Sequence, residues 1–168
     1  LSVKSGDCIF IFFPNGSGKS TLLSLITRTN SNKLTYTGSI HLNSSSIQKM
    51  PAKEFAQHVA FMSQFETNAW NFTSEQIILS GRFPHTNFAG FYSKDDIEIV
   101  KEVADKLNIT HLLERKIHTL SGGEFQKVRI ARTFAQETQF IIMDEPISSL
   151  DFGIEFSLLK QIKLIWLD

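Results

Sequence analysis

A short loop rich in glycine and serine carries the residue types of a phosphate-binding site. Glycines let backbone N–H groups converge on an anion, and a helix that begins at the loop adds the positive end of its dipole. In such a loop Lys19 would reach the β- and γ-phosphates of a nucleotide, and the hydroxyl of Ser20 would be a ligand of Mg²⁺. The loop consists of Asn15, Gly16, Ser17, Gly18, Lys19, Ser20 and Thr21.

The residues around this loop predict a strand before it and a helix after it. Residues 8–13 are all apolar or aromatic, which is typical of a buried parallel strand. We expect a helix from Lys19 to about Thr29. The strict phosphate-loop pattern has a glycine where this chain has Phe13. A glycine-rich turn that only begins a helix is therefore the alternative interpretation.

Two adjacent carboxylates follow a second apolar segment, residues 140–143, which predicts another buried strand. Open α/β sheets bind ligands at the carboxyl ends of their strands. Asp144 would hold Mg²⁺ there, directly or through water, and Glu145 would act as the general base that polarises the attacking water. Paired acids before Pro146 would also suit a simple turn, so it is the phosphate loop upstream that favours the catalytic interpretation.

A third motif, Ser121-Gly122-Gly123-Glu124, has the spacing of a helix capping box, and we expect the helix behind it at 125–135. A capped helix N-terminus with two glycines is itself an anion site, so a structural and a binding interpretation can both hold. Because the chain already has such a site at Lys19, a second one indicates either two ligands or one ligand shared between two chains.

The elements that would position these motifs form an α/β layered core. Further strand signals lie at 39–42 and 59–62, the latter ending close to Gln64. Residues 65 to about 119 differ, with helix signals at 75–79 and 95–107 and an N-cap pattern at Ser93 and Asp96. We therefore expect core segments at 1–64 and about 120–168, an inserted helical subdomain at about 65–119, and an amphipathic helix at 156–167. The predicted apolar stripe of the 95–107 helix is Ile97, Val100, Val103, Ala104 and Leu107.

The chain has 168 residues, which is the length of about one globular domain, and its 42% apolar and 20% charged side chains are typical of such a domain. Seventeen basic and seventeen acidic residues cancel, so no bulk charge favours nucleic acid or an anionic membrane. The five histidines lack metal-ligand spacing. We expect the fifteen phenylalanines to fill the core and Cys8 to be a buried structural thiol.

With these residues in place, the chain resembles the ATP-binding-cassette (ABC) ATPases over nearly its whole length. The resemblance implies a P-loop NTPase (RecA-like) core with an inserted α-helical subdomain. The motifs that carry it are 16–21 as Walker A, Gln64 as the Q-loop glutamine, 120–126 as the signature motif, 140–145 as Walker B and 148–151 as the D-loop. A narrower likeness, to the cassettes of iron–siderophore, haem and cobalamin importers, rests on 55–61, 81–85, 93–96 and 120–135.

The resemblance also implies a head-to-tail dimer with ATP and Mg²⁺ as cofactors. Ser121 and Gly123 of one chain would contact the γ-phosphate held by Lys19 of the other, and Asp151 would lie at the dimer seam. Gln64 would sense Mg²⁺ and water and couple the site to membrane-spanning permease subunits. The implied site residues are catalytic Glu145 and Gln64; nucleotide-binding Asn15, Gly16, Ser17, Gly18, Lys19, Ser20, Thr21, Ser121, Gly122, Gly123 and Asp151; and metal-binding Ser20, Gln64 and Asp144.

These expectations describe a peripheral subunit on the cytoplasmic face of the inner or plasma membrane, with an extracytoplasmic substrate-binding protein as an indirect partner and no nucleic acid. The family's adenine-stacking aromatic and switch histidine are not in the sequence, so we expect a fragment of a cassette with weak or no turnover by itself. Two alternatives stay open: a nucleotide-binding remnant without turnover, and a soluble cassette that acts on ribosomes or DNA. The sequence does not name the transported compound.

Overall fold

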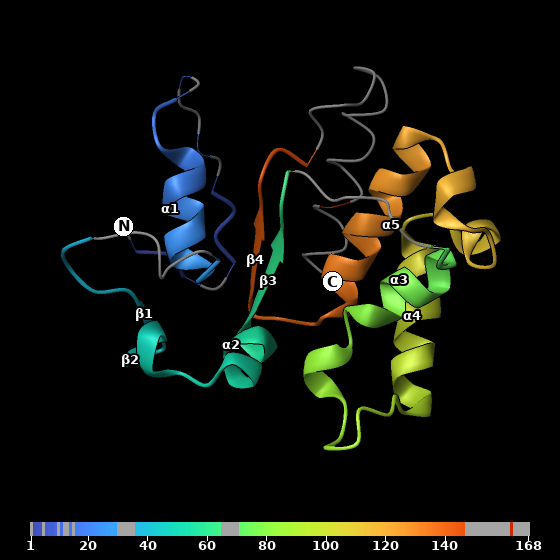
Figure 1. The fold of residues 1–168 in the computed structure, drawn as a ribbon, viewed down its shortest axis with the longest axis horizontal. Helices are drawn as coiled ribbons and strands as arrows, with labels where there is room; N and C mark the ends of the chain where they lie inside the picture. The colour runs from blue at the N-terminus through green and yellow to red at the C-terminus, as the bar shows by residue number, and fades with distance from the viewer. Residues whose placement is uncertain are drawn as a thin grey trace.

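The computed structural model describes residues 2–4, 6–9, 11, 14, 16–29, 36–64, 71–146 and 162 of the chain. Figure 1 shows two strands running side by side at the centre, with α1 to one side and the helices α3, α4 and α5 to the other. The helices are α1 (Lys19–Ile26), α2 (Ala52–His58), α3 (Ser74–Ser80), α4 (Lys94–Lys106) and α5 (Gly122–Ala135). The strands are β1 (His41–Leu42), β2 (Ser45–Ser46), β3 (Val59–Met62) and β4 (Phe140–Met143), and short 3-10 turns are η2 (Ile47–Lys49), η3 (Phe83–His85), η4 (Thr110–Leu112) and η5 (Ile117–Thr119).

The two central strands, β3 and β4, are parallel and pair in register from Val59 opposite Phe140 to Met62 opposite Met143. One further hydrogen bond, 2.9 Å from the amide of Asp144 to the carbonyl of Met62, continues the ladder past the end of the strands. Both strands were predicted, and their extents are confirmed. However, β4 was expected to be buried and its residues are only half-buried, whereas three of the four β3 residues are buried. Because the two strands are parallel and end together, the residues that follow them meet at the same edge of the sheet.

The main hydrophobic core lies where α5 packs against α3, α4 and β3. Its fully buried side chains include Met62, Ile78, Leu107 and Ile130. Burying a side chain of this size contributes about 1.5–3 kcal/mol. The core thus joins the helices to the strand that leads to Gln64.

The contact between α3 and α5 is close because Gly81 has no side chain. A Cβ atom at this position would lie 2.2 Å from the carbonyl oxygen of Arg132. Any larger residue would push the end of α3 away from α5.

Three of the helices begin with a complete capping box, which fixes where each helix starts. The sequence predicted a capping box at Ser121 with Glu124 and an N-cap at Ser93 with Asp96 in the first turn. Both are confirmed, and the cap at Ser93 is also a complete box. The third, Thr73 with Gln76 at the start of α3, was not predicted. Each cap is worth about 1 kcal/mol of helix stability.

Several expectations about burial were wrong. Cys8 is exposed, because it lies in a described segment that forms no strand. Ile97 is 39% exposed, since it lies one turn before the buried part of its stripe. The phenylalanines do not all fill the core: Phe72, Phe83, Phe88 and Phe91 are exposed.

Other expectations were close or lie partly outside the described residues. The helix expected to reach about Thr29 ends at Ile26. Residues 10, 12 and 13 of the strand expected at 8–13 lie outside the described residues, as does the helix expected at 156–167 apart from Ile162, which packs against the core. Within the described ranges, no helix has both the length and the apolar character of a membrane span.

Candidate nucleotide site

The glycine loop leads into α1 with two left-handed glycines. Gly16 has φ 80° and Gly18, the N-cap residue, has φ 92°, a backbone conformation that glycine adopts without steric cost. A Cβ atom at either position would meet nothing within 4 Å, so the space beside the loop is open. The Lys19 ammonium lies 3.4 Å from the carbonyl of Pro14, folded back over the loop. Asn15 and Phe13 lie outside the described residues.

The hydroxyl of Ser20 meets a carboxylate from the other end of the chain. Ser20 Oγ lies 3.5 Å from Asp144 Oδ2, across 124 positions of sequence. Ser20 lies in the first turn of α1, and Asp144 directly follows β4. Two oxygen ligands suit Mg²⁺, which is usually bound through one or two protein oxygens plus phosphates and waters. Among the described residues, no group of three or more histidine, cysteine or acidic side chains is arranged to hold a metal ion.

Gln64 and Glu145 are joined directly. The side-chain amide Nε2 of Gln64 donates a 2.6 Å hydrogen bond to Oε2 of Glu145. Each residue comes two positions after the end of its strand, so the in-register pairing of β3 and β4 brings them together. Glu145 has φ 51°, a left-handed conformation that costs a non-glycine residue about 1–2 kcal/mol. Strain of this kind at a strand end is typical of functional sites.

The signature segment forms the exposed N-terminus of α5. Ser121 Oγ accepts a hydrogen bond from the backbone amide of Glu124 at 3.3 Å. In return, the backbone amide of Ser121 donates to Glu124 Oε2 at 2.8 Å. These bonds, together with Arg115 at 3.0 Å, hold the pKa of the Glu124 carboxyl below its usual range. Both Ser121 and Gly122 are exposed, and a Cβ at Gly122 would meet nothing within 4 Å. The capping box therefore leaves the first turn of α5 accessible.

The structure brings together some of the predicted site residues and leaves others apart. It pairs Ser20 with Asp144 and Gln64 with Glu145. In Figure 1, α5 lies across the β3–β4 pair from α1, and in the described part of the chain no hydrogen bond joins its first turn to the glycine loop. Asp151 lies outside the described residues.

Two buried polar residues on α5 were missed by the sequence analysis. Gln126 donates to the carbonyl of Pro146, and Arg129 donates to the carbonyl of Ser63. Both lie within a helix that was predicted from its capping box, and Gln126 was noted only as part of the signature motif. Their spacing of three positions places them on one face of α5, but spacing does not reveal that the face is buried.

A buried ion pair on the far side of the helices was also missed. Arg82 Nε lies 2.7 Å from Asp96 Oδ1, and its Nη1 donates to the carbonyl of Ala135 at 2.7 Å and to Glu137 at 2.8 Å. Burial alone would raise the pKa of Asp96, but hydrogen bonds from Arg82 and Ser93 outweigh it and lower the pKa. This network joins the end of α3, the start of α4 and the end of α5.

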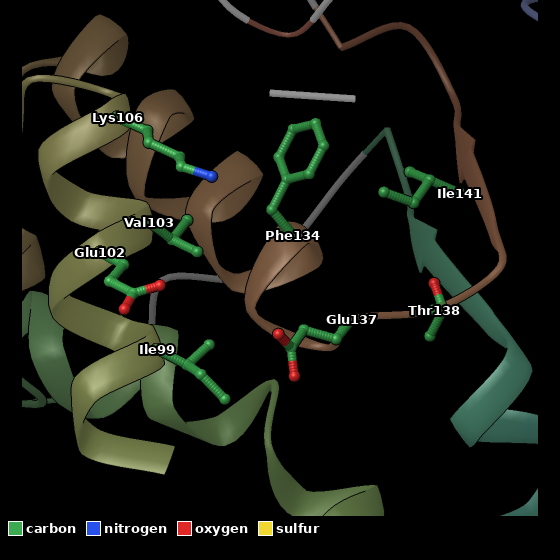
Figure 2. A pocket seen from close by; sticks show the side chains of 8 residues that line it. All are labelled: Ile99, Glu102, Val103, Lys106, Phe134, Glu137, Thr138 and Ile141. Carbon is green, nitrogen blue, oxygen red and sulfur yellow. The ribbon is translucent and has the colours of Figure 1, made fainter. Parts of the chain in front are cut away.

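A cavity of about 200 Å³ lies between α4, the end of α5 and β4. Figure 2 shows Phe134 and Ile141 projecting toward it, with Glu102, Lys106 and Glu137 around them. It is smaller than the usual 300–1,000 Å³ of a small-molecule site. None of its lining residues belongs to the predicted nucleotide site.

The fold and the paired contacts at the strand ends define an α/β protein of the P-loop NTPase class. The chain belongs to the ABC transporter family, which it matches over residues 1–148. It aligns with the structure of a metal-chelate type ABC transporter in an inward-facing conformation, with TM-score 0.78 and 31% identity, covering 97% of this chain and 60% of that one. An ATP-binding cassette of an ABC transporter aligns with TM-score 0.81 and 26% identity, covering 99% of this chain and 69% of that one.

Relatives of similar sequence carry names from iron uptake. The iron(3+)-hydroxamate import ATP-binding protein of Bacillus subtilis is 32% identical over 160 residues, which are 95% of this chain and 58% of the relative. The ferric enterobactin transport ATP-binding protein of Escherichia coli is 35% identical, with coverage of 95% and 58%. The hemin import ATP-binding protein of Rhodococcus jostii is 32% identical, with coverage of 95% and 53%. This chain thus spans somewhat more than half the length of the relatives it matches.

Proposed function

We propose that this chain binds and hydrolyses ATP to power an ABC importer of an iron chelate, of the siderophore, haem or cobalamin-like kind. The observation that carries the proposal is the 2.6 Å contact between Gln64 and Glu145 at the sheet edge, beside the 3.5 Å approach of Ser20 to Asp144. Family membership and the names of the relatives support the transport role and the class of compound.

The proposed reaction gives a role to each residue of this edge, and Gln64 has two. The loop amides and Lys19 would bind the β- and γ-phosphates, and Ser20, Asp144 and Gln64 would hold Mg²⁺. When bound, the metal ion would neutralise charge at the phosphate oxygens. Glu145 accepts a proton from water as the water oxygen bonds to the γ-phosphorus. The bond from the γ-phosphorus to the β–γ bridging oxygen breaks, and ADP leaves with that oxygen. Gln64, which is hydrogen-bonded to Glu145, orients that water and is itself unchanged by the reaction.

We place the rest of the machinery in a head-to-tail dimer. Ser121, Gly122 and Gly123 of one chain contact the γ-phosphate bound by the other, and Asp151 lies at the seam between them. Support comes from the exposed, capped N-terminus of α5, which offers backbone amides to an anion. In this arrangement the core comprises 1–64 and about 120–168, and the inserted helical subdomain comprises about 65–119.

The proposed partners are the permease subunits of the importer, and indirectly its extracytoplasmic substrate-binding protein. The chain would then lie at the cytoplasmic face of the membrane as a peripheral subunit. Support comes from four exposed aromatic side chains in the segment between α3 and α4, because exposed apolar patches mark interaction sites. They are Phe83, Phe88, Phe91 and Tyr92. The same segment is anchored by hydrogen bonds from Lys53 and Gln57 of α2 to the carbonyls of Thr86 and Pro84.

The test compares nucleotide binding with phosphate release in the presence of Mg²⁺. We expect the chain to bind ATP, and the intact protein assembled with its permease to release phosphate. Glu145→Gln should keep the binding and abolish the release. Binding with no release, unchanged by Glu145→Gln, would instead identify a nucleotide-binding remnant. Absence of binding would overturn the proposal altogether.

A further inference from the structure

We propose that Arg129 and Gln126 are positioning residues for the hydrolysis proposed above, forming a buried clamp on α5 that fixes Gln64 against Glu145. The proposal rests on the proposed function of that site. It assigns a role to Arg129 and to Gln126, the last residue of the signature segment, neither of which is among the implied site residues.

The clamp holds both backbone segments that carry the catalytic pair. Arg129 donates through Nη2 to the carbonyl of Ser63, the residue directly before Gln64. Gln126 donates through Nε2 to the carbonyl of Pro146, the residue directly after Glu145. The two side chains are themselves joined, since Arg129 Nη1 donates to Gln126 Oε1 at 2.9 Å.

Because the two side chains are buried, their hydrogen bonds hold the carbonyls of Ser63 and Pro146 in place. Gln126 is 4% exposed and Arg129 is 6% exposed, so water does not compete for their partners. A buried polar group that loses its hydrogen bond is left with a desolvation penalty, which holds each donor on its carbonyl. A buried guanidinium at position 129 carries a desolvation cost that an apolar side chain in the same place would not have. The guanidinium spans Gln126 and Ser63, because its planar fork presents several donors in fixed directions.

The clamp also connects the signature end of α5 to the catalytic pair. Along a helix with about 1.5 Å rise per residue, Gln126 and Arg129 lie roughly 8 and 12 Å from Ser121. A helix over this length behaves as a stiff rod that is fixed at its cap by Ser121 and Glu124. A displacement of the first turn of α5 would therefore shift the carbonyls of Ser63 and Pro146, and with them the contact between Gln64 and Glu145.

The experiment compares Arg129→Met and Arg129→Lys with the wild type in the intact protein, measuring kcat and KM for ATP, thermal stability and the side-chain amide NMR signal of Gln64. Lys127→Met is the matched control, because Lys127 lies on the same helix but its ammonium contacts the carbonyl of Leu107 at 3.5 Å, away from the sheet. Gln64→Leu identifies the Gln64 signal by its loss.

Displacement of catalytic groups by about 1 Å can cost roughly 100-fold in rate. We expect Arg129→Met to lower kcat by roughly that factor while KM changes less than about threefold, and to shift the Gln64 signal. Arg129→Lys should have a higher kcat than Arg129→Met, since lysine keeps one hydrogen-bond donor. If Arg129→Met does not fold, Arg129→Lys is the variant that is compared with the wild type. Lys127→Met should leave kcat and the Gln64 signal unchanged.

A normal kcat in both Arg129 variants, or an equal loss in Lys127→Met that follows thermal stability, would show a merely structural role and overturn the proposal. If the wild type binds ATP but releases no phosphate, the proposed function fails, and the Gln64 signal still decides the positioning. In that case a Gln64 signal that is unchanged in folded Arg129→Met overturns the clamp.

Discussion

The amide of Gln64 donates to the carboxylate of Glu145 at 2.6 Å, although the two residues are 81 positions apart. Their contact exists because β3 and β4 end at the same level of a parallel pair, with Met62 opposite Met143. The left-handed backbone at Glu145 turns the chain sharply after the strand. Together these features place a candidate base and a candidate water-orienting amide on one edge of the sheet.

We expect Gln64→Leu to lower ATP turnover by roughly 100-fold, because the carboxylate of Glu145 loses the group that fixes its geometry. Nucleotide affinity should change less than turnover, since the phosphate loop is untouched and Ser20 and Asp144 remain to hold Mg²⁺. Phosphate release and ATP titration measure the two effects separately. Gln57→Leu is the control, because it also removes one side-chain amide. Gln57 lies on α2, and its amide donates to the carbonyl of Pro84 at 2.9 Å. Turnover equal to wild type in Gln64→Leu would contradict the assigned role.

Ser121 can be tested for its two functions separately. Ser121→Ala removes the cap of α5 and should cost about 1 kcal/mol of stability. Ser121→Asp retains a capping side chain, so its melting temperature should stay near that of the wild type. Its added carboxylate would repel the γ-phosphate of the second chain, and we expect ATP-induced dimerisation to be lost. Dimerisation is measured by size-exclusion chromatography on a Glu145→Gln background. A dimer that survives Ser121→Asp would limit Ser121 to helix capping.

Gly81 should tolerate no larger residue. In Gly81→Ala the new methyl group would lie 2.2 Å from the carbonyl oxygen of Arg132, so α3 must move away from α5. Overpacking of this kind costs about 1–3 kcal/mol, which urea unfolding would show as a lower midpoint with an unchanged slope. Gly122→Ala is the control, because a Cβ there meets nothing within 4 Å. Equal midpoints for the two variants would show that the close contact does not constrain the fold.

The ion pair between Arg82 and Asp96 should make stability fall in acid. The folded pKa of Asp96 is lowered, so its stabilisation is fully present above the ordinary value near 4 and is lost as the pH falls below that value toward the folded pKa. We expect the free energy of unfolding to decline over that window. Asp96→Asn should cost about 3 kcal/mol at pH 7 and flatten this part of the decline. The exposed neighbour Asp95 provides the control, Asp95→Asn. An unchanged pH profile in Asp96→Asn would contradict the assignment.

Much of the local structure could be predicted from single segments. The apolar runs of β3 and β4 gave both strands with their ends, and the Ser93 and Ser121 patterns gave the starts of α4 and α5. These signals are local, because a cap or a strand run is satisfied by residues close in sequence. The phosphate loop, the paired acids and the signature were likewise readable from residue type and spacing.

The tertiary structure decided which polar groups are buried and what they bind. Arg129 and Gln126 look like ordinary helix residues in the sequence, and only the packing of α5 against the strand ends brings them to Ser63 and Pro146. The same holds for Arg82, whose acid partners lie 14 and 55 positions away. Helical periodicity predicts that side chains share a face, but it does not say which part of the chain covers that face.

The sequence by itself therefore determined the candidate chemistry of this protein: a predicted phosphate loop, two acids after an apolar strand, a glutamine after another, and a capped helix start as a predicted second anion site. Only the tertiary structure decided that Gln64 meets Glu145 and that α5 reaches the backbone on both sides of them. The physical reason is that motifs are specified by neighbouring residues, whereas contacts between motifs depend on the register of β3 with β4 and on the burial of α5 against them.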